Sequence, residues 1–539
     1  MKTTTTTTRS RRALLGLAAL GLVAVACKKP PPPVTPEPEP PPPVVAEPAA
    51  PAWPDEPFRA TRPEPGPLAE LTLPKTQRFT LESGVEVYLV EQRTLPTLYM
   101  TLEFDRGGVD DPANKLGMHS LCMDLLSEGT ARLDKVAFEE AQADLAIQLW
   151  ASAGGETSTV GLRALKSQMG PALDLFAEML TAPGLREKDL ERLRDRYKTS
   201  LAQRRGSPNS VSPRVFPSLV WGTGHPYAPI PTEATYDAIK AADCKAVAGK
   251  LKPGGARLFV VGMITEAELR AELGARLGKW KGKAPTARKI PAPRPRSGTI
   301  FLVDMPGAAQ SVISIGHLGP ERGAADYDAT YLMAQILGGS FSSRINMNIR
   351  EDKGFAYGAR GGYDYERHGS VFEASSSVRT DATGPALREI VKEIRGMRAG
   401  DPTPEELRRE QEGAIAAMPA TFATPTRTLG AYRSLVYFGL PLDWYDSRQA
   451  RLRAVTPAAI HKAAADHLKE SDYVVLVVGD AAVVRPDLEK MAEERLFGAG
   501  GLVVLDADGK PVTGAAPAKP AAEKPAAKPA ADKPAPAGK

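Results

Sequence analysis

Hydrophobic residues follow two alternating patterns along this chain, short β-rich runs and longer amphipathic stretches. The runs Leu258–Gly262 and Val474–Gly479 are almost wholly apolar and rich in β-branched residues, which predicts buried strands. Each run follows a stretch with helical spacing of its apolar positions, Ile239–Leu251 and Pro457–Leu468. The alternation of strands with helices predicts an α+β fold.

The same order of elements occurs twice. Gly262 and Gly479, which end the two apolar runs, lie 217 residues apart. Earlier strand and helix candidates also correspond, Leu98–Phe104 with Met118–Ser127 in the first half and Gln310–Ile315 with Tyr327–Leu337 in the second. A period this long indicates duplication of a whole domain. We expect two homologous α/β-sandwich domains, residues 67–278 and 299–510, each a mostly antiparallel sheet flanked by helices.

A basic segment separates the two predicted domains. Lys279–Arg296 is rich in proline and carries seven basic residues and no acidic one. Proline-rich polar stretches between periodic segments are typical of exposed linkers. We interpret residues 279–298 as an interdomain linker; a nucleic-acid-binding patch is the alternative.

The N-terminus has the pattern of an export signal. A basic segment precedes the apolar run Ala13–Ala26, which is too short to span a bilayer comfortably. The run Ala24–Cys27 resembles the lipobox of bacterial lipoproteins, which implies removal of residues 1–26 and acylation of Cys27. An ordinary signal peptide with a chance cysteine and an uncleaved anchor are the alternatives. Ser10–Leu15 also resembles a twin-arginine signal, so the export route stays open.

Both ends of the mature chain are low in complexity. Residues 27–66 form a Pro-rich tether that favours an extended polyproline II conformation. Residues 511–539 repeat Ala, Pro and Lys, a composition that cannot bury a core and predicts disorder. The tail is interpreted as a solubilising segment; contact with cell-wall or lipid anions is the alternative.

Charge and cysteine content exclude several classes of protein. The formal charge is +5, and loss of the four basic residues in the leader leaves 65 basic against 64 acidic side chains. This balance excludes a global electrostatic footprint for nucleic acid. Three cysteines exclude a disulfide scaffold or a zinc ribbon. Cys122 and Cys244 could pair in an oxidising compartment, but their helical, apolar surroundings favour buried thiols.

Three segments of the first half resemble one known family. They are Leu81–Glu91, Gly107–Pro112 and Lys115–Thr130, and they resemble the pitrilysin/insulinase family of zinc peptidases, which includes the mitochondrial processing peptidase and bacterial two-subunit relatives. The resemblance spans roughly residues 75–500. It implies that the two domains face each other across a chamber. Members of the family carry a glycine, two residues, His-x-x-Glu-His and a closing Gly-Thr.

The zinc motif itself is altered in this chain. When the family motif is aligned on Gly117 and on the pair Gly129-Thr130, Ser120 and Asp124 fall at the two histidine positions and Met123 falls at the glutamate position. Serine is a poor zinc ligand, and a thioether cannot act as a base. Asp124 alone is one ligand, which does not make a site. The apolar residues around these positions have the spacing of a packed helix.

No neighbouring residue rescues the motif. His119 precedes Asp124 by five residues, about 140° around a helix, so the two do not converge. The resemblance implies a further glutamate ligand near Ser200–Leu201, and the acids Glu191 and Asp195 lie about one to three turns short. We therefore predict no catalytic residue, no metal and no cofactor in this chain. A solitary peptidase with other ligands would have to use His119 and Asp124.

The second half retains a different motif. Gly338–Arg344 leads into Ile349–Tyr357, which resembles the family's Arg-Glu-x-x-Gly-x-Ala-Tyr segment. The resemblance implies that Arg350 and Tyr357 bind the substrate backbone and stabilise the oxyanion opposite the zinc. An arginine fork and a tyrosine hydroxyl suit that task. The alternative is that Arg350 pairs with a neighbouring acid and Tyr357 packs in a strand. His225 lies in a loop that also resembles the family and is interpreted as structural.

These observations predict a non-catalytic, substrate-binding subunit of a heterodimeric zinc metallopeptidase. The expected partner is a subunit of the same family that carries the zinc, and the expected substrate is a peptide. The leader predicts a lipid-anchored protein of the bacterial cell envelope, facing the periplasm from the outer membrane. The alternative is a scaffold or binding lipoprotein that keeps the fold without taking part in proteolysis.

Overall fold

The computed structural model describes residues 57–61, 66, 72–283, 286 and 288–512. The chain divides into two compact units, residues 1–67 and 68–539. The described part of the first unit contains a short 3-10 helix, η1 (Pro57–Ala60). The predicted leader, Cys27, most of the tether and the tail beyond residue 512 lie outside the described residues, so those predictions stand as predictions. From residue 68 onward, both predicted domains fall within the second unit.

The first half of the second unit is built on a six-stranded sheet. Its strands are β1 (Gln77–Thr80), β2 (Glu86–Glu91), β3 (Thr97–Phe104), β4 (Gln148–Ala153), β5 (Ser158–Leu165) and β6 (Arg257–Gly262). They are ordered β1-β2-β6-β3-β5-β4, and every neighbouring pair is antiparallel except β2 and β6.

The second half repeats this sheet. Its strands are β7 (Thr299–Asp304), β8 (Gln310–Gly319), β9 (Ala356–Glu366), β10 (Gly369–Arg379), β11 (Val474–Gly479) and β12 (Leu502–Leu505). The order β12-β7-β11-β8-β10-β9 matches that of the first sheet strand for strand from β7 to β9. Only the first edge strand differs, because β12 is parallel to β7 whereas β1 is antiparallel to β2.

Helices follow the strands in the same order in both halves. The first half contains α1 (Met118–Leu126), α2 (Lys135–Asp144), α3 (Met169–Thr181), α4 (Glu187–Arg205), α5 (Pro208–Val220), α6 (Glu233–Asp237), α7 (Ala241–Gly249) and α8 (Glu266–Leu277). The second contains α9 (Tyr327–Ala334), η5 (Gln335–Gly339), α10 (Arg344–Asn346), η6 (Met347–Asp352), α11 (Thr383–Ala399), α12 (Pro404–Thr421), α13 (Pro425–Tyr437), α14 (Arg448–Ala454), α15 (Pro457–His467) and α16 (Ala481–Glu493). The expected fold of two α/β sandwiches is confirmed.

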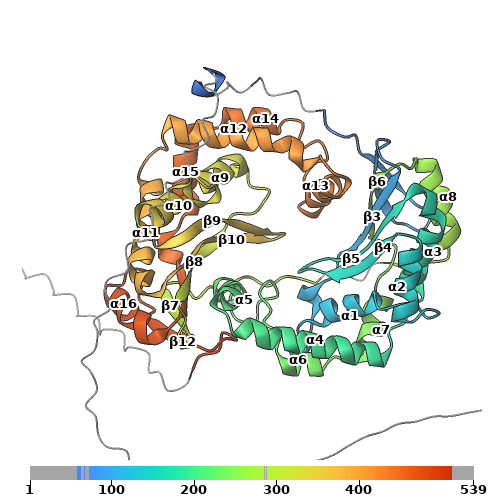
Figure 1. The fold of residues 1–539 in the computed structure, drawn as a ribbon, viewed down its shortest axis with the longest axis horizontal. Coiled ribbons are helices and arrows are strands. Elements are labelled where there is room, and N and C mark those ends of the chain that lie inside the picture. The colour runs from blue at the N-terminus through green and yellow to red at the C-terminus, as the bar shows by residue number, and fades with distance from the viewer. Residues whose placement is uncertain (1–56, 62–65, 67–71, 284–285, 287, 513–539) are drawn as a thin grey trace, which may run out of the picture. The chain divides into compact units, whose positions relative to one another are not determined.

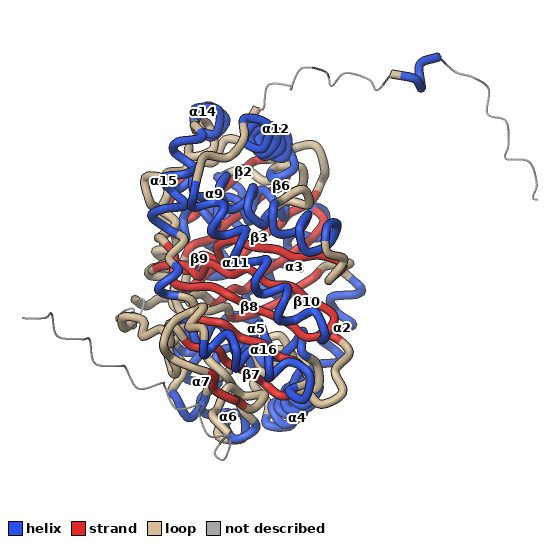
Figure 2. The backbone as a smooth tube through the Cα atoms, turned by 90° about the vertical axis from the view of Figure 1, so that its left-hand side faces the viewer, coloured by secondary structure: helices blue, strands red, loops and turns tan. Residues whose placement is uncertain are grey.

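Strand alternation explains how each sheet is covered on both faces. In β11, Val475 and Val477 pack in the core on the face that α11 and α16 cover, which we call the outer core. Val474, Leu476 and Val478 pack in a second core on the opposite face, which we call the inner core. Successive side chains of a strand point to opposite faces, so a continuous apolar run indicates burial on both. Figure 2 shows α11 and α16 in front of the strands of the second sheet.

The inner cores are formed by helices exchanged between the halves. From the first half, α5 places Val215, Phe216 and Leu219 on the inner face of the second sheet. From the second half, α13 places Leu429 and Leu435 on the inner face of the first sheet. In Figure 1, α5 lies beside β8 and α13 lies across from β3 and β6. Each half therefore depends on the other to bury its sheet.

The structure matches the predicted strands and helices closely. The run predicted at Val474–Gly479 is β11 with the same bounds, and the run at Leu258–Gly262 is β6, one residue longer at its start. The helix predicted at Tyr327–Leu337 ends as an α-helix at Ala334 and continues as the π-helix η5. No helix of the described residues is long and apolar enough to cross a membrane.

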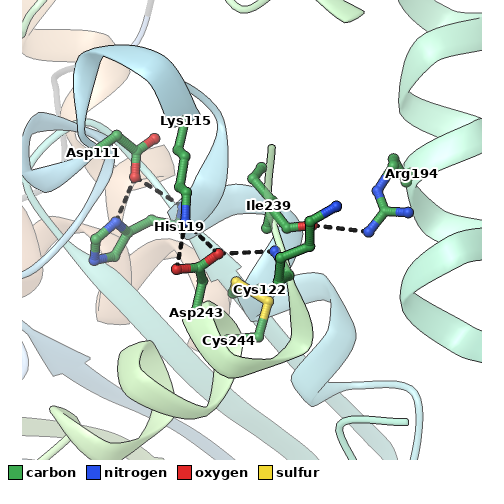
Figure 3. The surroundings of a disulfide bond; sticks show 9 residues. Asp111, Lys115, His119, Cys122, Arg194, Ile239, Asp243 and Cys244 are labelled. Carbon is green, nitrogen blue, oxygen red and sulfur yellow. Dashed lines mark hydrogen bonds and ion pairs between the residues drawn. A yellow bond between two sulfur atoms is a disulfide. The ribbon is translucent and has the colours of Figure 1, made fainter. Parts of the chain in front are cut away.

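The prediction of buried thiols at Cys122 and Cys244 is wrong. The two residues form a disulfide that joins α1 to α7 across 122 residues of chain (Figure 3). Both are buried, as their apolar neighbours predicted. Only the packing of α1 on α7 brings them together, and Nζ of Lys115 supports it with contacts of 2.7 Å to both carboxylate oxygens of Asp243.

Most described residues of the predicted linker 279–298 are exposed. Its end is held against the inner core, since the Arg296 amide donates to the Leu219 carbonyl and its guanidinium lies 4.5 Å from the centre of the Phe301 ring.

Candidate functional site

Helix α1 carries the altered zinc motif. Met123, at the position of the general base, is fully buried in the outer core of the first half. Leu121, Cys122 and Leu125 are also buried. The helix packs on β4, α4 and α7. Packing into the core therefore accounts for most of the residues of this helix.

Asp124 is engaged by α4. Its Oδ2 accepts hydrogen bonds from the Tyr197 hydroxyl at 2.9 Å and from Nη2 of Arg196 at 3.1 Å. Burial raises the pKa of the Asp124 carboxyl above its ordinary value. The helix in which the resemblance implies a further glutamate ligand thus presents a cation and a hydroxyl, both of which are hydrogen-bond donors to Asp124.

His119 is held on another side of the helix. Its Nδ1 lies 2.6 Å from Oδ1 of Asp111, which also accepts the His119 amide at 3.0 Å. His119 is buried, and its contacts anchor the loop before α1. The ring thus contacts Asp111, whereas Asp124 contacts α4.

A zinc ion does not fit these residues. The family positions hold a serine, a thioether and a carboxylate that is bound to an arginine, and a cation nearby opposes a second positive charge. Within the described residues, no three His, Cys, Asp or Glu side chains gather in a way that could hold a metal ion. No chemical step through zinc is derived for this chain.

Arg350 lies in η6, a π-helical turn of a kind often found at functional sites. Its Nη1 donates to the Tyr357 carbonyl at 3.0 Å, its Nε lies 2.9 Å from Oε1 of Glu351, and its guanidinium lies 4.8 Å from the centre of the Phe341 ring. The pairing with a neighbouring acid that was the alternative does occur, through Glu351. It leaves 40% of the Arg350 side chain exposed.

Tyr357 does not pack in its strand. It lies where the pairing of β9 with β10 shifts register between Ser376 and Val378, and it is 89% exposed. Bulges of this kind re-aim side chains. Gly354, with φ of 60°, makes the turn that leads from η6 into β9, a conformation that glycine adopts without strain. The glycine of the motif thus brings Tyr357 back beside Arg350.

Both residues line one large cavity. Its volume is about 820 Å³, and its walls include Phe341, Arg350 and Tyr357 together with Ser212 of α5. A second cavity of about 390 Å³ is lined by Trp221, Tyr227 and Glu366. The two share five lining residues, Gly338, Gly339, Arg360, Glu373 and Ser375. We call this continuous space the inner groove.

The floor of the inner groove is polar because of strand alternation. In the pairing of β9 with β10, Arg360 lies opposite Ser375 and Asp364 lies opposite Val371. Tyr363 and Phe372, which lie between these pairs, pack in the outer core. Helix η5 lies close against β9 beside this floor, since a Cβ on Gly338 would lie 2.4 Å from the Gly361 nitrogen. Sequence reasoning missed this surface, although the period-two pattern of polar residues in 360–366 and 373–377 was a signal for it.

The far end of the groove holds a set of polar contacts, most of them half-buried, and the contact between Tyr437 and Glu156 joins the two halves. The Tyr437 hydroxyl lies 3.2 Å from Oε1 of Glu156 and 3.2 Å from Oε2 of Glu366. The Tyr227 hydroxyl donates to Oε1 of Glu156 at 2.6 Å. Burial, with a smaller contribution from Asp364, raises the pKa of Glu366 to about 7.

His225 has the structural role that was predicted for it. Its Nε2 lies 3.0 Å from the Pro291 carbonyl oxygen, and its Nδ1 accepts the Tyr227 amide at 3.2 Å. Its ring stacks on Trp221 with centres 5.1 Å apart. Burial lowers the pKa of the imidazole.

Two facing α/β sandwiches, a metal position without metal ligands and an intact Arg/Tyr groove define a peptidase-like chain with a degenerate metal site. Residues 86–220 match the sequence model described as "Insulinase (Peptidase family M16)", and residues 251–414 match "Peptidase M16 inactive domain". Together the matches span more than half of the chain, which belongs to the insulinase (M16) family. The predicted resemblance is confirmed.

The chain also resembles individual proteins in sequence or in fold. The chain is 23% identical over 408 residues, covering 74% of it and 93% of the relative, to a Helicobacter pylori protein named "Non-peptidase homolog YmxG". A solved M16 inactive domain from Pseudomonas fluorescens matches with a TM-score of 0.70 and 24% identity, over 75% of this chain and 98% of that one. The periplasmic protease PqqL of Escherichia coli matches with a TM-score of 0.64 and 15% identity, over 78% of this chain and 47% of that chain.

Proposed function

We propose that this protein is the non-catalytic, substrate-binding subunit of a heterodimeric zinc peptidase of the M16 family. The observation that carries the proposal is the placement of Arg350 and Tyr357 on one cavity of about 820 Å³, with Tyr357 almost fully exposed. A zinc site opposite them would have to come from a partner, because the metal position of this chain holds Ser120, Met123 and Asp124.

The chemistry of the groove suits an extended peptide. Arg350 has one nitrogen on a backbone carbonyl and one on Glu351, and it presents a fixed positive charge to the cavity. The Tyr357 hydroxyl is a hydrogen-bond donor within the same space. A preorganised donor of this kind stabilises negative charge on a carbonyl oxygen as the peptide bond is attacked.

The test is peptide turnover by this chain reconstituted with a zinc-bearing M16 subunit. Arg350→Ala and Tyr357→Phe are each expected to lower kcat by about 10²–10³-fold, the usual loss for one oxyanion donor. Arg408→Ala, at a 66% exposed arginine of α12, is the matched control and should leave turnover unchanged. Turnover that is the same in the Arg350 variant and the control would refute the proposal.

We also propose that the protein is a lipoprotein of the cell envelope that faces the periplasm. The lipobox-like run before Cys27 and the disulfide between Cys122 and Cys244 support this, since disulfides persist in oxidising compartments. The test is the mass of the N-terminal peptide and the fractionation of the Cys27→Ala variant. An unmodified Cys27 in a soluble wild-type protein would exclude the anchor.

The second candidate is a scaffold or binding lipoprotein that holds peptides without cleavage. The name "Non-peptidase homolog" of the Helicobacter pylori relative favours it. The two candidates differ in one measurement. A scaffold binds an unfolded peptide alone with an affinity that Arg350→Ala weakens, and adding a zinc-bearing M16 subunit produces no cleavage that depends on Arg350.

A further inference from the structure

One arginine of the inner groove has no acidic partner. Arg360 lines both cavities of the groove, so it lies at the part that the two share. It is exposed, and no carboxylate of the described residues lies within ion-pairing distance of its guanidinium. Arg350, by contrast, is paired with Glu351 and with the Tyr357 carbonyl. An unpaired guanidinium inside a cavity can receive an anionic group of the molecule that occupies the cavity.

Strand alternation sets the direction in which Arg360 points. Its neighbour Ala359 packs in the outer core, and its other neighbour, Gly361, lies against η5. Because successive side chains of a strand point to opposite faces, Arg360 points to the inner face. The residue opposite it on β10 is Ser375, whose short side chain leaves room for the guanidinium.

The charges on this face of β9 change sign along the groove. Asp364 lies four residues after Arg360, so it points to the same face, about 13 Å further along the strand. It is also exposed and has no cation of the described residues within ion-pairing distance. Glu373, another acid of this floor, interacts with Ser314, and burial raises the pKa of its carboxyl. The floor of the groove therefore offers one free cation and one free anion in line.

We propose that Arg360 is a specificity-determining residue that binds a carboxylate of the peptide, and that Asp364 favours a basic side chain four residues away from it. This deepens the proposed function and rests on it, because it takes the groove to be a peptide site. In an extended peptide, side chains four positions apart point to the same side with the same spacing. The substrate class is an extended segment with an acidic and a basic residue four positions apart.

The other residues of the lining suit a peptide better than a polyanion. Asp364 and Glu366 line the smaller cavity, and they oppose a second negative charge next to the one that Arg360 receives. The larger cavity also contains uncharged side chains that can hydrogen-bond to peptide groups. They include Asn209, Ser212, Gln310 and Ser375.

The experiment is fluorescence anisotropy of labelled peptides of about ten residues, long enough to span both cavities, on the full chain without a partner. The reference peptide carries Glu and Lys four positions apart in a background of Ala and Ser. Replacement of its Glu by Gln should weaken binding about tenfold, as expected for the loss of one charge-assisted contact. A shift of the Lys by one position should also weaken binding, because the side chain then points to the opposite side.

Variants of Arg360 identify the residue responsible. Arg360→Gln should bind the reference peptide about tenfold more weakly and should no longer distinguish Glu from Gln in the peptide. Arg360→Glu should reverse the preference, so that a peptide with Lys in place of Glu binds more tightly than the reference. A residue that only supports the fold does not produce such a reversal. Arg408→Glu, at a 66% exposed arginine of α12, is the matched control and should keep the wild-type preference.

Equal affinity of the wild type for the Glu and Gln peptides, or a preference for Glu that survives in Arg360→Glu, would overturn the proposal. Failure of every peptide to bind would overturn it as well. Turnover with a zinc-bearing M16 subunit separates this failure from failure of the proposed function. Cleavage that depends on Arg350 but is the same for the Glu and Gln peptides would refute the role of Arg360 and leave the proposed function standing.

Discussion

At the scale of single residues, the loss of a zinc site is a set of replacements that reinforce one another. Met123 faces a packed core, and Asp124 has become the acceptor for Arg196 and Tyr197 of α4. Restoring one family residue would leave the others in place. The replacements have become part of the packing between α1 and α4.

Met123→Glu tests this coupling. A carboxylate at a fully buried position has no cation or donor to pair with, and we expect a loss of about 3 kcal/mol or more in the free energy of unfolding. Urea denaturation measures the loss, and bound zinc per chain should stay at zero. Met123→Leu is the matched control and should cost less than about 1.5 kcal/mol. A stable glutamate variant that binds zinc would contradict this account of α1.

A second residue-scale prediction concerns Glu406, which supports the segment ahead of Arg350. Two hydrogen bonds from Arg344, of 2.7 and 2.8 Å, hold the pKa of Glu406 at about 2. A lowered pKa contributes stability above the ordinary value of 4.5, and this contribution is lost as the pH falls toward 2. Glu406→Gln should therefore cost about 1 kcal/mol at neutral pH, after allowance for solvent screening.

The stability cost of Glu406→Gln should shrink as the pH falls below about 4, because protonation of the wild-type carboxyl begins to remove its stabilising contact with Arg344. Denaturation curves at several pH values measure the difference. Glu412→Gln, at a 60% exposed side chain of the same helix, is the control. A cost that is independent of pH would show that the ion pair is not its source.

At the scale of elements, covalent and noncovalent contacts fix α1. The disulfide to α7 closes a loop of 122 residues, and a loop of that length constrains the unfolded chain by roughly 4–5 kcal/mol in the entropic account. The same helix packs on β4 and α4. The element at which the family resemblance places the zinc motif is here a strongly anchored part of the scaffold.

Reduction of the disulfide should therefore lower the melting temperature of the protein. Cys122→Ala together with Cys244→Ala should reproduce the effect without reductant, and a further addition of reductant should then do nothing. Thermal unfolding with and without reductant measures both. Alkylation of two thiols in the unreduced, unfolded wild type would contradict the assignment of the bond.

At the scale of the whole molecule, the exchange of α5 and α13 makes the two halves interdependent. Phe216 and Leu219 from the first half are buried on the second sheet, and Leu435 from the second half is buried on the first. Each such side chain contributes about 1.5–3 kcal/mol. The linker marks where one sequence repeat ends and the next begins. It does not separate two independent bodies, because each half packs a helix on the sheet of the other.

Residues 72–278 and 299–512 expressed separately should each expose an inner sheet face and fail to form a soluble, cooperatively folded protein. Coexpressed, they should copurify. A chain cut at the exposed Lys289 by an inserted protease site is the control, and its halves should stay together in size-exclusion chromatography. Separation of the cut halves, or cooperative melting of either one alone, would contradict this interdependence.

Sequence determined much of this protein, because local patterns report burial directly. The strands β6 and β11, the helix at α1 and the duplicated order of elements follow from apolar spacing. The identities of Ser120, Met123 and Asp124 exclude the zinc chemistry of the family without any coordinates. The motif around Arg350 and Tyr357 predicts the pair, and the turn at Gly354 brings them to one cavity.

Tertiary structure alone decided the contacts between residues far apart in the chain. No spacing rule relates Cys122 to Cys244, and the apolar residues around each cysteine fit a thiol as well as a disulfide. The Tyr437 hydroxyl lies 3.2 Å from both Glu156 and Glu366, and only the docking of α13 and of the β9–β10 hairpin on the first half brings these three residues together. Strand and helix periods record which face of an element is buried. These periods do not indicate which distant element covers the buried face, because that depends on the packing of the whole chain.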